Sequence, residues 1–255
     1  MEVDKTARLI LILSLLSIPL AVVLSGDYPI ILLLVSVTWL VSPAFFVNDK
    51  PLFQLCLAQS LFFVTLYVRV LASASVSNFD PNNLVTLHFE QGLALIVLFL
   101  LAKRFYSTSM LRLSLQGVSR ALVVGLMVGL PFGVVDYLSG EGIVTMPGLG
   151  LAWSFIWIVT ISILVGLLEE ILFRGVIYLP ARNVVGARWG SLYQALLFSA
   201  VHYPNPLSAL AAALLFGVVM VFLLQRTGNL FAPIVAHTSN NVVWMMLGRI
   251  GGLPF

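Results

Sequence analysis

The strongest constraint on the fold is a charge-free apolar run, Leu151 to Leu168, that ends in two adjacent glutamates, Glu169 and Glu170. A helix needs about 20 predominantly apolar residues to span the hydrocarbon core of a bilayer. A charged side chain at membrane depth costs roughly 2.5–3.5 kcal/mol on insertion scales, so such residues usually mark a functional site. The pair therefore predicts a membrane-embedded site built around carboxylates.

Apolar runs of this kind fill the rest of the chain. Of its 255 residues, 60% are hydrophobic and 9% are charged, whereas soluble domains carry about 25% charged residues. We therefore predict an all-α fold, a polytopic transmembrane bundle of eight or nine spans. The candidate spans are 9–24, 30–47, 52–72, 91–104, 118–138, 151–177, 190–203, 207–225 and 231–248.

Basic residues at the ends of these runs predict the orientation of the chain. With nine alternating spans and a cytoplasmic N-terminus, only Arg69 and Arg249 of the thirteen basic residues fall on the outer side. The net charge of +3 therefore reflects membrane topology, and we expect a lipid bilayer as partner and no nucleic acid. The same alternation places these acidic residues in outer loops: Asp27, Asp80, Glu90, Asp136 and Glu141.

Three polar clusters interrupt three different spans at compatible depths. At a rise of 1.5 Å per residue, they lie about 9–20 Å from the predicted inner ends of their helices. Within each cluster, residues four positions apart share a helix face. The clusters are Glu169 and Glu170 with Arg174, Phe198 with His202, and His237 with Asn241.

The first cluster contains a predicted division of roles. Glu170 precedes Arg174 by four residues, which is the favourable order for an ion pair on a helix. Glu169 points about 100° away from Glu170. We therefore expect Glu170 to pair with Arg174 and brace the helix, and Glu169 to face a cavity.

Taken together and in this order, the three clusters resemble the motifs of the CPBP family. This is the CAAX protease and bacteriocin-processing group of membrane proteases, also called Abi proteins. The resemblance covers roughly residues 118–248. It implies a catalytic helical core over 118–255, preceded by N-terminal spans and an inner-surface link over 1–117.

The resemblance implies an intramembrane glutamic endopeptidase that needs no cofactor. Glu169 would activate a water for attack on a peptide carbonyl, and His202 would assist it. His237 and Asn241 would stabilise the tetrahedral oxyanion. Supporting roles would fall to Glu170, Arg174 and Phe198. The implied substrate is a membrane-associated protein or peptide, lipidated or not, at the plasma membrane of a bacterium or archaeon.

The residues also allow other functions. Paired intramembrane acids can line an ion or proton path, although a proton-coupled transporter should show broken helices or inverted repeats. Some CPBP proteins are associated with immunity, so a binding protein of the same fold is a second alternative. Glu169, His202 and His237 could hold a metal ion, but the metalloprotease signature His-Glu-x-x-His is absent, and we predict a metal-free site.

Overall fold

The computed structural model describes residues 48–75, 84–105, 112–140, 150–202 and 205–251, with shorter stretches between residues 5 and 46. Every regular element in these ranges is helical, as expected where backbone polar groups must be satisfied within the membrane. The predicted all-α class is confirmed for this part of the chain. The elements are η1 (Ser42–Phe46), α3 (Lys50–Ser75), α4 (Leu84–Phe105), α5 (Val118–Ser139), α6 (Leu151–Glu170), the π-helix η2 (Ile171–Ile177), α7 (Tyr178–Ala200), α8 (Leu207–Thr227) and α9 (Phe231–Gly251).

Four helical stretches in the described residues are long and apolar enough to cross a bilayer. A further apolar helix, over His88–Ala102, is shorter. The predicted number of eight or nine spans is therefore not confirmed. The first predicted span, 9–24, lies largely outside the described residues, and the second, 30–47, lies partly outside them. The four stretches are Lys50–Val68, Val118–Ser139, Leu151–Ala200 and Leu207–Thr227.

The predicted break between the spans 151–177 and 190–203 falls inside α7. The helix continues from α6 through η2 into the first part of α7 and is interrupted at Gly186, whose backbone is not helical (φ 84°, ψ 166°). A Cβ atom added at Gly190 would lie 2.9 Å from the backbone nitrogen of Arg182, so the chain folds back on itself at Gly186. This reversal brings the cluster at the end of α6 close to Phe198 and His202.

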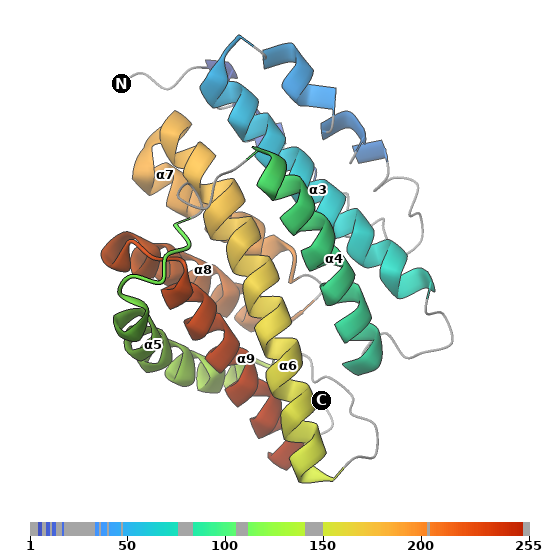
Figure 1. The fold of residues 1–255 in the computed structure, drawn as a ribbon, viewed down its shortest axis with the longest axis vertical. Helices are drawn as coiled ribbons and strands as arrows, with labels where there is room; N and C mark the ends of the chain where they lie inside the picture. The colour runs from blue at the N-terminus through green and yellow to red at the C-terminus, as the bar shows by residue number, and fades with distance from the viewer. Residues whose placement is uncertain are drawn as a thin grey trace.

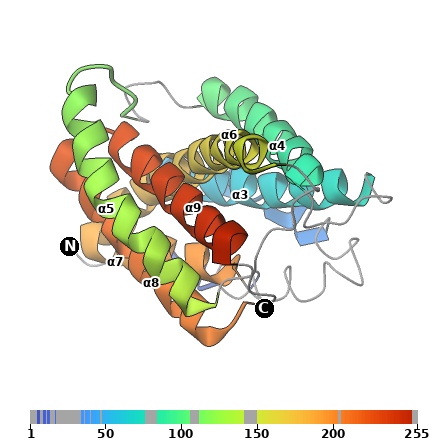
Figure 2. The ribbon, with the colours of Figure 1, turned by 90° about the horizontal axis from the view of Figure 1, so that it is seen from below.

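Helix α6 lies at the centre of the bundle (Figure 1), with α3 and α4 on one side and α5, α8 and α9 on the other. It contacts both α4 and α9 directly. The end view in Figure 2 shows the same arrangement, with α5 and α9 side by side. The glutamates at the end of α6 therefore lie between the two halves of the bundle.

Glycines on one face of α5 allow a close approach to α9. A Cβ atom added at Gly125 would lie 2.7 Å from the Ala232 carbonyl oxygen, and one at Gly133 would lie 2.5 Å from that of Asn240. Small residues at four-residue spacing let helix backbones meet in this way. The close contact places the C-terminal end of α5 against the middle of α9.

The turn before α9 fixes where this contact begins. The Asn229 amide nitrogen donates to the carbonyl oxygens of Ser114 (2.7 Å) and Gln116 (3.1 Å), and its oxygen accepts from the Phe231 backbone N–H (3.0 Å). Asn229 is buried. The starts of α5 and α9 are therefore held together, and the register of the glycine contact follows from this junction.

Candidate active site

Glu170 is the buried centre of a charge cluster that joins α6 to α9. Its Oε1 atom lies 2.9 Å from Arg174 Nη1 and accepts a hydrogen bond of 2.7 Å from His237 Nδ1. Glu170 and Arg174 are both fully buried, and the contact of the guanidinium is ionic rather than a well-aligned hydrogen bond. The predicted Glu170–Arg174 pair is confirmed. The link to His237 was not predicted, because it joins residues 67 positions apart.

Phe198 fills the space beside this cluster and contacts most of its members. The Arg174 guanidinium carbon lies 4.6 Å from the Phe198 ring centroid, a cation–π geometry. The same ring packs against His202 (4.8 Å between centroids) and against the edge of His237 (5.8 Å). Phe198 thus holds the imidazoles and the guanidinium in a fixed mutual arrangement.

Glu169 lies on the other side of His237. Its Oε2 atom is 3.8 Å from His237 Nε2, and its carboxylate interacts electrostatically with His202. Glu169 also borders a small hollow of about 10 Å³ whose lining includes Phe62 and Thr65 of α3. The side chain is 9% exposed. Glu169 therefore faces a cavity, as predicted, and one wall of that cavity comes from the N-terminal half of the chain.

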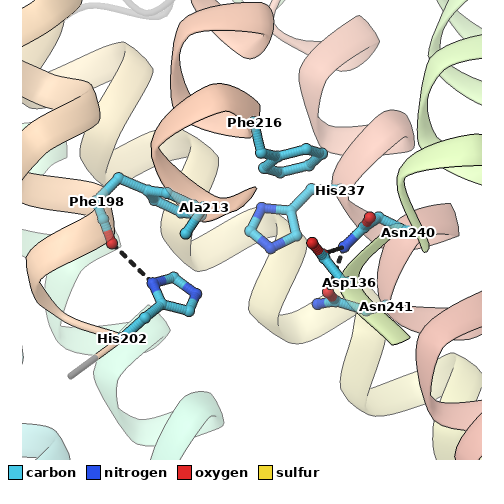
Figure 3. A pocket seen from close by; sticks show the side chains of 8 residues that line it. All are labelled: Asp136, Phe198, His202, Ala213, Phe216, His237, Asn240 and Asn241. Atoms are coloured by element: carbon cyan, nitrogen blue, oxygen red, sulfur yellow. Dashed lines mark hydrogen bonds between the residues drawn. The ribbon is translucent and has the colours of Figure 1, made fainter. Parts of the chain in front are cut away.

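His202, His237 and Asn241 meet around a second cavity of about 20 Å³, large enough for one water molecule (Figure 3). The structure brings these three predicted site residues together, and Glu169 Oε2 lies 3.8 Å from His237 Nε2. His202 lies in the turn that follows α7, just beyond the helix end at Ala200. The cavity is lined by Asp136, Phe198, His202, Ala213, Phe216, His237, Asn240 and Asn241.

The hydrogen bonds of the two histidines determine which ring nitrogens are available for catalysis. His202 Nδ1 donates to the Phe198 carbonyl oxygen at 2.7 Å, because a carbonyl can only accept. His237 Nδ1 is directed in the same way to the Glu170 carboxylate. In both rings Nε2 is left for other partners: it accepts when the ring is neutral and donates when the ring is protonated.

Two polar residues of this site, Asp136 and Asn240, were missed from the sequence. Asp136 was predicted to lie in an outer loop, but it is buried near the end of α5, where its Oδ2 accepts a 2.7 Å hydrogen bond from Asn240 Nδ2. Its place three residues after Gly133, at the end of the glycine face of α5, was the available signal. Glu90 was also predicted in an outer loop and is instead buried in α4, whereas Asp27, Asp80 and Glu141 lie outside the described residues.

The π-helix η2 begins directly after the two glutamates and contains Arg174. All seven of its residues are buried. Short π-helical turns inside α-helices occur frequently at functional sites, because they change the directions in which successive side chains point. Here the turn directs Arg174 toward Glu170 and Phe198 in the interior of the bundle.

The site gives no geometric support to the alternative of a bound metal. Within the described residues, no group of three or more His, Cys, Asp or Glu side chains is arranged to hold a metal ion. His237 already uses Nδ1 for Glu170, and the Glu169 carboxylate is 3.8 Å from its Nε2. The metal-free character of the site stays a prediction.

Residues 151–243 match the family model described as Type II CAAX prenyl endopeptidase Rce1-like. This segment is therefore similar to that family. It runs from the start of α6 into α9 and contains every residue of the three motifs, so the predicted family resemblance is confirmed over this range. No curated protein and no solved structure matches the chain.

The match supports a membrane protease of the CAAX endopeptidase type, acting on a membrane-associated protein. Asp136 and the whole of α5 lie before the matched segment. The described structure therefore adds a cavity wall that the match does not include. The predicted boundary between an N-terminal part and a core at residues 117 and 118 stays a prediction.

Proposed function

We propose that the chain is an intramembrane glutamic endopeptidase that hydrolyses a peptide bond of a membrane-associated protein or peptide. The observation that carries this proposal is the cavity shared by His202, His237 and Asn241, with Glu169 beside His237. Around His237 these side chains supply a general base, a second proton acceptor and two hydrogen-bond donors. These are the parts that peptide hydrolysis requires.

In the proposed reaction, Glu169 takes a proton from the water as the water oxygen bonds to the peptide carbonyl carbon. His202 holds the water through Nε2, since its Nδ1 is occupied by Phe198. The carbonyl oxygen becomes an oxyanion that receives hydrogen bonds from protonated His237 Nε2 and from Asn241 Nδ2. When the carbon–nitrogen bond breaks, the proton on Glu169 passes to the leaving amine.

The Glu170–Arg174 pair supports this chemistry without touching the substrate. Glu170 fixes the ring of His237 through Nδ1, and Arg174 balances the buried carboxylate. A histidine that is oriented in advance needs no rearrangement during the reaction, which is how preorganised donors lower a barrier. Removing one such donor typically lowers the rate by about 10²–10³.

The substrate approaches from within the membrane or from its cytoplasmic surface, since the chain is proposed to have a cytoplasmic N-terminus. The proposed site needs no cofactor, because the base and the donors are all side chains of the chain itself.

The test is cleavage of quenched peptides, prenylated and unprenylated, by purified protein in liposomes. Wild type is compared with Glu169→Gln and with Glu90→Gln, a matched change at a buried carboxylate of α4 away from the site. We expect wild type and Glu90→Gln to cleave and Glu169→Gln to be inactive but folded. Full activity in Glu169→Gln would exclude the proposed base, and no cleavage by folded wild type would favour a binding or immunity protein.

A further inference from the structure

Asp136 lines the cavity but has no part in the reaction described above. We propose that it is a positioning residue, which orients the Asn241 amide through Asn240. The inference deepens the proposed function and rests on it, because the orientation of Asn241 matters only if Asn241 donates to an oxyanion. The three side chains form one connected chain from α5 to the middle of α9 (Figure 3).

The first link selects one of two orientations of Asn240. An asparagine amide fits the same space with its oxygen and nitrogen exchanged. Asn240 Nδ2 lies 2.7 Å from Asp136 Oδ2, and a carboxylate oxygen accepts hydrogen bonds but does not donate them. The carboxylate therefore holds the amide nitrogen of Asn240 on the side of α5.

The second hydrogen bond fixes the orientation of the Asn241 amide in turn. The same Asn240 Nδ2 atom donates to Asn241 Oδ1 at 3.3 Å. The oxygen of Asn241 thus faces Asn240, and its nitrogen points to the other side, toward the cavity (Figure 3). With the opposite orientation, a carbonyl oxygen would face the developing oxyanion and repel it.

Burial and packing hold Asp136 in the position that this role requires. Asp136 is 7% exposed and Asn240 is 3% exposed. One turn of helix away, Gly133 lies against the backbone of Asn240 itself, where an added Cβ would be 2.5 Å from the carbonyl oxygen. The distance between the carboxylate and the amide is therefore set by the contact of two helices, not by a flexible loop.

The amide oxygen of Asn240, which has no hydrogen-bond partner in the described residues, argues against a role that only joins two helices. Asn240 Oδ1 is buried and has no hydrogen-bond partner within the described residues. A buried polar atom without a partner is destabilising. A residue that served only to join α5 to α9 would be expected to use both ends of its amide, whereas Asn240 uses its nitrogen alone, for two acceptors.

The orientation can be tested without any cleavage. The full chain is labelled with ¹⁵N-asparagine in detergent, and the side-chain NH₂ signals of Asn240 and Asn241 are assigned from their alanine variants. We expect Asp136→Ala to shift both signals, and Asp136→Asn, which keeps an acceptor oxygen, to shift them less. An unchanged Asn241 signal in folded Asp136→Ala would overturn the inference, and this result would stand whether or not the protein is a protease.

The kinetic consequence separates positioning from a structural role. We expect Asp136→Ala to lower kcat by about 10–100-fold with KM nearly unchanged, which is less than the 10²–10³ typical for removing a donor. Asp136→Asn should keep most of the activity. Combining Asp136→Ala with Asn241→Ala should give a kcat no lower than that of Asn241→Ala alone, because the two residues act as a unit.

A control variant shows what a structural effect would look like. Gly125→Ala disturbs the α5–α9 contact without touching the cavity, because an added Cβ there meets Ala232 and Val235. In the double variant with Asn241→Ala, the two fold-reductions in kcat should multiply, because the two changes act independently. If the reductions from Asp136→Ala and Asn241→Ala also multiplied in their double variant, the role of Asp136 would be structural and the inference would fail.

Discussion

Replacing Glu170 by alanine should strongly destabilise the protein, because it leaves Arg174 buried without a counter-charge. Both side chains are fully buried, and their charged atoms are 2.9 Å apart. Removing one partner of a buried ion pair costs about 3–5 kcal/mol. The cation–π contact of Arg174 with Phe198 is retained and contributes about 2 kcal/mol when desolvated, but it supplies no counter-charge.

At roughly 2–4 °C per kcal/mol for a chain of this size, the loss corresponds to a fall in Tm of about 6–20 °C. The assay is thermal unfolding in detergent, followed by circular dichroism and repeated as an SDS titration. The matched control is the double variant Glu170→Met with Arg174→Met, since replacing both partners of a buried pair by apolar residues is often neutral. The double variant should regain most of the stability yet cleave slowly, because His237 has lost its acceptor. Exposed ion pairs contribute up to about 1 kcal/mol. If Glu170→Ala lowered the free energy of unfolding by less than this, the reasoning that the pair is buried and stabilising would be refuted.

Further outcomes follow from the same geometry. Asn241→Ala should lower kcat by about 10²–10³ in the peptide assay with little change in Tm, and an unchanged kcat would remove Asn241 from the oxyanion site. Phe198→Leu should lower stability by roughly 2–3 kcal/mol in the SDS titration, from lost packing and the lost cation–π contact. Gly129→Ala should be destabilising, because a Cβ there meets the backbone of Ala236. Gly92→Ala should be neutral or stabilising, because no atom lies within 4 Å of a Cβ at that position. Equal effects of the two variants on Tm would contradict the close contact between α5 and α9. Chelators should leave the cleavage rate unchanged, and a loss restored by zinc would overturn the metal-free site.

Contacts within one helix could be predicted from the sequence. The Glu170–Arg174 pair and the Phe198–His202 contact both join residues four positions apart, and helical geometry alone places such residues on one face. Hydropathy likewise predicted the helical class, because only helices and closed barrels satisfy their backbone within a bilayer. These inferences need no knowledge of how helices pack.

Contacts between distant helices could not be predicted in the same way. The bonds from His237 to Glu170 and from Asn240 to Asp136 depend on the register of α6, α5 and α9, which hydropathy does not encode. Asp136 lies at the end of an apolar run and so has the pattern of a loop residue. Its role becomes visible only when the glycine face of α5 is placed against α9.

The π-helix η2 makes the spacing after Glu170 sensitive to length. A π-helical turn bonds residue i to i+5 where an α-helix bonds i to i+4, so it accommodates one residue more in each hydrogen-bonded turn. Deleting one residue from 175–177 would let the segment return to an α-helix, and α6 and the start of α7 would keep their relative orientation because the deleted residue is the one that the π-helical turn accommodates. Tyr178 would stay in the core, whereas the direction of Arg174 relative to Glu170 would change. Homologous chains that lack one residue here should therefore keep the packing of α7 but lose the present geometry of the Glu170–Arg174 pair.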